Sequence, residues 1–224
     1  MTDPDTTTEL DHVVTCSLDY YDELAAALGE TIGAATHRSI LALGTASTAL
    51  EHGLAILTTV QGGQLASASV LLRAQFEAVT RALWLHYCAD DPWIEAYFRS
   101  VRDNPNRDPG TDIKMQKLLD DLETHAPPAI ARMLQPLKQG AWGPLNSYVH
   151  SGIHAIAHQH VNLTDDFADS TLRNANGLAG MAAMLIAMSS GDSEFVHRIA
   201  QIQHDHLDCL PPLNPTPAPA AGPG

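Results

Sequence analysis

Basic residues are scarce in this chain of 224 residues. Twelve Lys and Arg stand against 26 Asp and Glu, which gives a formal net charge of −14 at pH 7 with neutral His. A field of that sign repels phosphate backbones, so the composition excludes sequence-independent binding of nucleic acid over a broad surface. A local basic pocket is still compatible with it.

Cysteine and long apolar runs are also rare. Cys16, Cys88 and Cys209 are odd in number and far apart, which matches neither a disulfide framework nor a Cys-x-x-Cys metal knuckle. The N-terminus has neither the basic start nor the apolar run of a secretory signal. The longest apolar stretch, residues 181–188, is too short to span a bilayer. We therefore expect a soluble, cytoplasmic protein that does not interact with membranes.

Strand-like alternation is missing as well. Ala, Leu and Met dominate and β-branched residues are scattered, which favours helices throughout. The breaks predict long helices near 31–61, 63–89, 143–161, 167–190 and 193–209, with short helices between residues 92 and 136. Since the chain suits one core, we predict an all-α, single-domain helical bundle of about five long helices plus short helices.

The two ends differ in composition from the centre. The first residues are polar, and the segment after Leu210 consists mostly of Pro and Ala without a periodic pattern. Segments of this kind bury little apolar surface. We predict a disordered N-terminus at 1–14, a helical bundle domain at 15–210 and a disordered Pro/Ala-rich tail at 211–224.

A column of charges marks the second long helix. Arg73, Glu77 and Arg81 are spaced four residues apart and share one stripe. The helix is apolar nearly all round, so it is expected to be central and its charges need partners. Arg73 can pair with Glu77 along the helix. That pair is either part of a functional site or a partly buried ion pair that fixes helix register.

A column of histidines follows at the same spacing. His150, His154 and His158 would lie on one side of a single helix, with Val149 and Ile153 on the other. Stacked imidazoles disfavour one another's protonation, so most of the column is expected to be neutral near pH 7. We expect this column to form the other wall of a buried polar layer with Arg73 and Glu77.

Three interpretations of the histidine column stay open. His150 or His154 could act as general acid or base while Arg73 holds an anionic group. Two histidines could ligate zinc with Glu77 as a third ligand. The histidines could also be hydrogen-bonded inside a helical core. Since His-Glu-x-x-His is absent and no acidic residue falls between Asn146 and His160, we predict no metal site and no cofactor.

A second polar cluster stands near the C-terminus, in the run from His204 to Cys209. His204 and Asp208 share a helix face while His206 points elsewhere, so one helix cannot gather all of these side chains. We interpret the run as a solvated last turn with chance affinity for nickel or zinc.

A bacterial family of unknown function, whose members are all-helical, has signature segments that resemble LLRAQFEAVTRALWLHYCADD and WGPLNSYVHSGIHAIAH. The first segment carries Arg73 and Glu77. The second carries a Trp, then Leu-Asn146, then His150 and a Gly. The likeness runs from about residue 30 to residue 190.

More remotely, Asn146-x-x-x-His150 is similar to the second half of the signature of HEPN domains. These helical bundles occur in bacterial toxin–antitoxin and antiphage systems, and many are metal-independent ribonucleases that work as dimers. Leu145 stands where their Arg is found, so Arg73 would have to supply the guanidinium. The resemblance implies a role on RNA, a nucleotide or another small anionic ligand in a local pocket, with His150, Asn146 and Arg73 at the site. With Glu77 and His154 from the two columns, the candidate catalytic residues are His150, His154, Arg73, Glu77 and Asn146.

Two other functions remain open. One is a non-catalytic helical interaction or small-ligand-binding module with a structural Arg/Glu/His polar core, and the other is a bundle metalloprotein. In either case we expect a homodimer, because a helix with two apolar faces, such as residues 177–188, needs more cover than a small bundle supplies.

Overall fold

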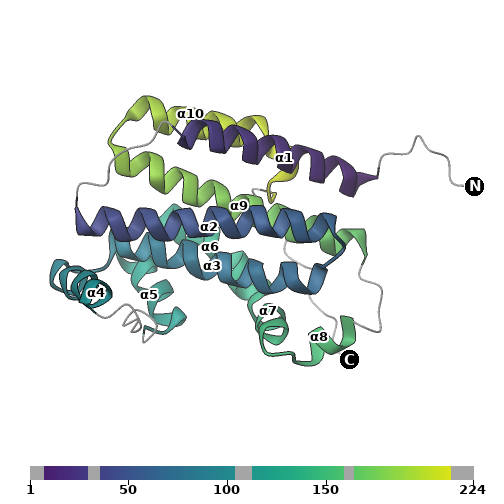
Figure 1. The fold of residues 1–224 in the computed structure, drawn as a ribbon, viewed down its shortest axis with the longest axis horizontal. Coiled ribbons are helices and arrows are strands. Elements are labelled where there is room, and N and C mark those ends of the chain that lie inside the picture. The colour runs from purple at the N-terminus through teal and green to yellow at the C-terminus, as the bar shows by residue number, and fades with distance from the viewer. Residues whose placement is uncertain (1–7, 30–35, 104–112, 159–163, 213–224) are drawn as a thin grey trace, which may run out of the picture.

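The computed structural model describes residues 8–29, 36–103, 113–158 and 164–212. Within those ranges the chain forms ten α-helices, a short 3₁₀ helix and no strand (Figure 1). The prediction of an all-α helical bundle is confirmed. In chain order the elements are α1 (Glu9–Leu28), α2 (His37–Gln61), α3 (Leu65–Tyr87), α4 (Asp91–Asp103), α5 (Met115–His125), α6 (Pro128–Gly140), α7 (Trp142–Val149), α8 (Ile153–His158), α9 (Asp165–Ser190), α10 (Ser193–Asp205) and η2 (Leu207–Cys209).

The core gathers around α9. This helix packs against α1, α2, α3 and α10, and α2 also packs along α3. Figure 1 shows α1 and α10 on one side of α9, α2 and α3 on the other, and α4, α5, α7 and α8 beyond α3. Small side chains such as Ala175, Ala179 and Ala183 are fully buried on α9, which lets its neighbours approach closely. Because one chain already covers most of α9, the apolar stretch 177–188 does not require a second copy.

The helical region begins earlier than the sequence suggested. Thr8 and Asp11 form a capping box: the Thr8 hydroxyl accepts from the Asp11 backbone N–H at 3.2 Å, and the Asp11 carboxylate accepts from the Thr8 N–H at 3.0 Å. Helix α1 therefore starts at Glu9, inside the stretch 1–14 that composition assigned to a disordered end. Residues 1–7 and most of the tail, 213–224, lie outside the described residues.

The expected helix over 143–161 is wrong, because the chain turns between α7 and α8. Ser151 has φ 52°, in the left-handed region. Its N–H donates to the Tyr148 carbonyl at 3.3 Å, and the Gly152 N–H donates to the Ser147 carbonyl at 2.7 Å. This pair of bonds is a Schellman ending, which terminates a helix. A Cβ at Gly152 would lie 2.6 Å from the Ser147 hydroxyl, so the turn favours glycine there.

Helix α2 is long and apolar. By length and composition it is the one helix in the described ranges that could cross a membrane, a test that core helices of soluble proteins also pass. In the structure it packs on α3 and α9.

Candidate functional site

The segment that carries Arg73 and the segment that carries Asn146 meet where α7 packs on α3. The Arg73 Nε donates to Glu77 Oε1 at 2.7 Å, and Nη2 lies 2.6 Å from the same oxygen. The third nitrogen, Nη1, donates to Asn146 Oδ1 at 2.8 Å. The predicted pairing of Arg73 with Glu77 is therefore present, and Asn146 joins it from a helix 73 residues further along the chain.

An indole orients this guanidinium. The Arg73 Cζ lies 3.4 Å from the centre of the Trp142 ring, within the range of a cation–π contact. The Lys138 Nζ lies 4.3 Å from the same ring, and Phe76 meets the ring edge-on at 5.5 Å. Burial, and next the positive charge of Arg73, lower the pKa of Lys138. Two cations thus share one indole in an otherwise acidic protein.

The Arg73 side chain is 15% exposed, whereas Glu77 is 40% exposed. The Arg73 nitrogens Nε, Nη1 and Nη2 each have a protein partner, which fixes the plane of the guanidinium. A side chain held in this way can position α7 against α3, and its remaining N–H groups can meet an anion at the rim. The cluster can therefore serve either as a structural tie or as an anion-binding wall.

The histidines do not form the expected second wall. His150 caps the end of α7 and His154 lies in α8, and both are exposed. Among the described side chains, neither imidazole hydrogen-bonds to Arg73, Glu77 or Asn146; at this turn it is the His154 backbone N–H that donates, to the Ser147 hydroxyl at 3.1 Å. The column fails because the Schellman ending at 150–152 breaks the helical spacing. The side chain of His158 lies outside the described part.

Leu145, which precedes Asn146 in α7, is buried in the core. Its neighbour Asn146 is exposed, and it is Asn146 that receives the guanidinium of Arg73. His150 follows one helical turn later, with its N–H donating to the Asn146 carbonyl at 3.2 Å. Arg73 thus supplies, from another helix, a guanidinium beside the Asn146-x-x-x-His150 segment.

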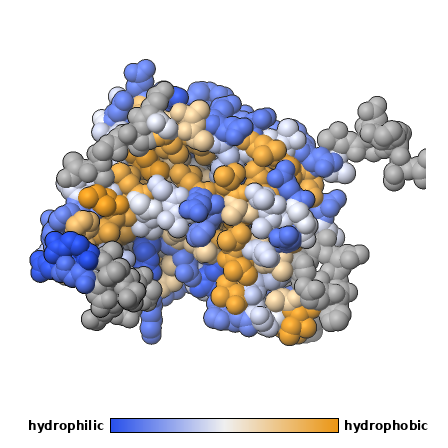
Figure 2. Space-filling view, viewed as in Figure 1, coloured by the Kyte–Doolittle hydropathy of each residue, from blue (hydrophilic) through white to orange (hydrophobic). Residues whose placement is uncertain are grey.

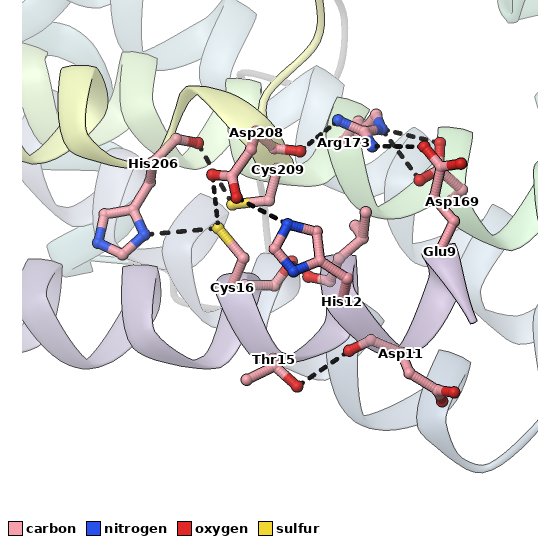
Figure 3. Close-up of polar contacts among 12 residues, drawn as sticks. Glu9, Asp11, His12, Thr15, Cys16, Asp169, Arg173, His206, Asp208 and Cys209 are labelled. Carbon is pink, nitrogen blue, oxygen red and sulfur yellow. Dashed lines mark hydrogen bonds and ion pairs between the residues drawn. The ribbon is translucent and has the colours of Figure 1, made fainter. Parts of the chain in front are cut away.

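A second cluster, not foreseen from the sequence, joins α1 to the residues after α10 (Figure 3). The Cys16 Sγ lies 3.5 Å from His206 Nδ1 and donates to Asp208 Oδ1 at 3.1 Å. Within the run from His204 to Cys209, the residues 204, 205, 207 and 208 are exposed, as we expected of a solvated last turn. His206 and Cys209 are buried together with Cys16, and the expectation is wrong for these two. The helix ends at Asp205, and the following 3₁₀ turn points His206 and Cys209 inward.

Burial dominates the acid–base behaviour of this cluster. Burial raises the pKa of the Cys16 thiol, and the nearby Cys209 and Asp208 raise it further. Burial also raises the pKa of the Cys209 thiol. Both are thiols near neutral pH. Hydrogen bonds from Cys16, and also from His12, lower the pKa of Asp208, which is therefore ionised.

Only one set of metal-ligating side chains converges in the described ranges. Cys16, His206 and Cys209 each offer a ligand atom, and these atoms lie within 4.8 Å of one another. The alternative set of His150, His154 and Glu77 does not come together among the residues that the structure describes. In the sequence, only the neighbouring residues His206 and Cys209 indicated that metal-ligating side chains gather here. The partner of His206, Cys16, is 190 residues away.

Comparison with known proteins adds a family but no function. No curated protein and no solved structure matches the chain. A family model of unknown function, DUF6988, matches residues 46–212, which include α3, α7 and the His206–Cys209 segment but not α1. The match fits the expectation of an uncharacterised family and covers most of the described bundle, so the chain belongs to the DUF6988 family.

Proposed function

We propose that this protein is HEPN-like and acts on RNA, or on a nucleotide, at the α3–α7 surface in a bacterial toxin–antitoxin or antiphage system. The observation that carries the proposal is the hydrogen bond of 2.8 Å between Arg73 Nη1 and Asn146 Oδ1. It joins the two signature segments and sets a guanidinium beside the segment that ends in His150.

Each residue has a role that its surroundings support. Arg73 stabilises negative charge that develops on a phosphate, and the Trp142 ring keeps its plane fixed. His150 is exposed at the end of α7 and transfers the proton, because imidazole is the side chain best suited to proton transfer near neutral pH. Asn146 lies between them and positions the guanidinium. Glu77 pairs with Arg73, and His154 lies in α8, on the far side of the turn from His150.

An apolar surface beside these residues favours a homodimer. Val149, Ile153 and Ile156 are 42%, 72% and 54% exposed. They flank His150 and His154 in sequence, and Figure 2 shows apolar surface at the lower edge of the molecule, in the region of α8. Two copies that bury this surface against each other would bring two His150 side chains toward one interface.

The test is cleavage of mixed RNA substrates by tag-free protein in EDTA. We expect cleavage, loss of cleavage in His150→Ala, and wild-type cleavage in His197→Ala, which alters an exposed histidine of α10 away from the site. A melting curve in the same EDTA buffer separates loss of fold from loss of chemistry. Folded dimer that cuts no RNA, or His150→Ala that cuts as the wild type does, would refute the ribonuclease role.

One observation favours a second candidate, a non-catalytic module with a structural polar core. The Nε, Nη1 and Nη2 atoms of Arg73 have partners without any ligand, as a structural tie between helices requires. In that case Glu77→Gln lowers the melting temperature and removes no activity, since none exists. A Glu77→Gln variant that melts like the wild type would argue against this second function.

A further inference from the structure

The buried side chains of Cys16, His206 and Cys209, together with the exposed side chain of Asp208 beside them, have the donor types of a zinc site. Cysteine thiolates, imidazoles and carboxylates are all ligand types that zinc takes in proteins. The three ligand atoms of Cys16, His206 and Cys209 are mutually within 4.8 Å. They come from both ends of the described chain, α1 and the η2 turn, so the fold itself brings them together.

The distances suit one ion at the centre. Zn–S bonds of about 2.3 Å and Zn–N bonds of about 2.0 Å in a tetrahedron place sulfur about 3.6 Å from nitrogen. The Cys16 Sγ is 3.5 Å from His206 Nδ1. The Asp208 Oδ1 is 3.1 Å from the same sulfur, but this exposed side chain stands outside the set of ligand atoms that lie within 4.8 Å of one another. It therefore has to turn toward the ion to complete a tetrahedron.

The outer contacts orient the donor atoms. The His206 Nε2 lies 3.2 Å from Glu23 Oε1, which places the ring proton on Nε2 and leaves the Nδ1 lone pair facing Cys16. A carboxylate behind a ligating imidazole is a regular feature of zinc sites. The Asp208 Oδ2 is held by His12 Nε2 at 2.8 Å, which leaves Oδ1 for the ion.

The backbone that carries the ligands is also held in place. The Arg173 Nη1 donates to the Asp208 carbonyl at 2.5 Å, and the Asn176 Nδ2 donates to the Cys209 carbonyl at 2.8 Å. Both donors come from α9, the central helix, and Figure 3 shows the contact from Arg173. A turn fixed in this way does not have to be ordered by the metal when the metal binds.

We propose that Cys16, His206 and Cys209, with Asp208 as the fourth ligand, bind one structural Zn²⁺ ion that joins α1 to the segment after α10. Binding forms two Zn–S bonds, one Zn–N bond and one Zn–O bond. Two S–H bonds break, and both protons pass to solvent. Four protein ligands leave no open position, so the ion stabilises the fold and does not bind substrate. The site is independent of the function proposed for α3 and α7.

The first test uses reduced, tag-free wild-type protein whose three thiols are titrated after denaturation. Addition of Co²⁺ as a probe is expected to give the near-ultraviolet thiolate-to-cobalt charge-transfer band and the visible bands of tetrahedral cobalt. Stoichiometric Zn²⁺ is expected to remove both. Reduced, folded protein that shows no charge-transfer band, or only the bands of octahedral cobalt, overturns the proposal, as does a Cys16–Cys209 disulfide in freshly isolated protein.

Variants locate the ion. Cys209→Ser is expected to lose the charge-transfer band or to keep a weaker one, whereas Cys88→Ser, which alters the remaining cysteine, keeps the wild-type spectrum. Glu23→Gln, which weakens only the outer contact to His206, is expected to bind Co²⁺ about 10- to 100-fold more weakly. Loss of the band in Cys88→Ser, or an unchanged affinity in both Cys209→Ser and Glu23→Gln, refutes the assignment. The wild-type spectrum tests the proposal without any variant. If a variant fails to fold, the result for the wild-type protein still decides.

Discussion

A close approach of three helices, at Gly53 in the middle of α2, offers a sharp test of the bundle. A Cβ at this position would overlap the Tyr21 hydroxyl of α1 and lie 2.7 Å from the Gln75 Nε2 of α3. The Tyr21 ring cannot simply swing away, because it is buried and packs edge-on against Tyr20 at 6.0 Å. Three helices therefore have to separate slightly to admit one methyl group.

Gly44 provides a matched control on the same helix. It is exposed, and an added Cβ there meets nothing within 4 Å. Gly44→Ala should stabilise the protein by about 0.5–1 kcal/mol, the difference in helix propensity between Gly and Ala. Gly53→Ala gains the same propensity but adds the cost of an overpacked core, about 1–3 kcal/mol. The difference between the two variants isolates that cost, because the propensity term cancels.

Thermal and urea unfolding of both variants measures this difference. For a chain of this size about 1–3 kcal/mol corresponds to a melting temperature roughly 2–12 °C lower for Gly53→Ala than for Gly44→Ala. In a Tyr21→Phe background the hydroxyl is gone, so Gly53→Ala should cost less than it does alone. Equal stability of the two alanine variants would refute the close packing of α1, α2 and α3 at this point.

Three further predictions concern individual contacts. In a double-mutant cycle of Arg73→Ala and Asn146→Ala, unfolding should show a coupling of about 0.5–3 kcal/mol, which additive effects would contradict. Burial by itself raises the pKa of Asp121. The hydrogen bonds from Trp84, at 2.9 Å, and from Lys117 outweigh burial, so the net pKa lies below the usual range. The ionised carboxylate thus stabilises above its unfolded pKa of about 3.9, so Asp121→Asn should destabilise at pH 7 and the gap to the wild type should close as pH falls below about 4, as urea unfolding at both pH values will test. Asn176→Ala removes two buried hydrogen bonds of 2.8 Å and should cost about 2 kcal/mol or more in urea unfolding, a cost that a neutral result would exclude.

Local spacing predicted what depends on a single helix. Arg73 and Glu77 lie four residues apart on one straight segment, so their ion pair followed directly from the sequence. The same rule failed for His150 and His154, because it assumes an unbroken helix and Ser151 adopts a left-handed conformation. Gly152 was the available signal, since glycine just beyond an apolar period often marks a helix end.

Contacts across the chain could not be predicted in this way. Helix α1 was missed because its polar start concealed the Thr8–Asp11 capping box, although Val13, Tyr20 and Leu24 follow a helical spacing and are buried. The cluster around Cys16 was missed for a different reason. Its parts are ordinary when taken separately, and only the packing of α1 beside the η2 turn brings them together.

That packing also affects how the protein is made. The contact of Cys16 with His206 joins residues 190 positions apart, so it cannot form until nearly all of the described chain has left the ribosome. Contacts of such long sequence separation are slow to form, because a large loop has to close first. During synthesis α1 therefore emerges early and keeps its inner face uncovered until the last helices arrive. A chain halted before residue 206 would lack the η2 turn, and the part of α1 around Cys16 that this turn covers would stay open to chaperones and proteases.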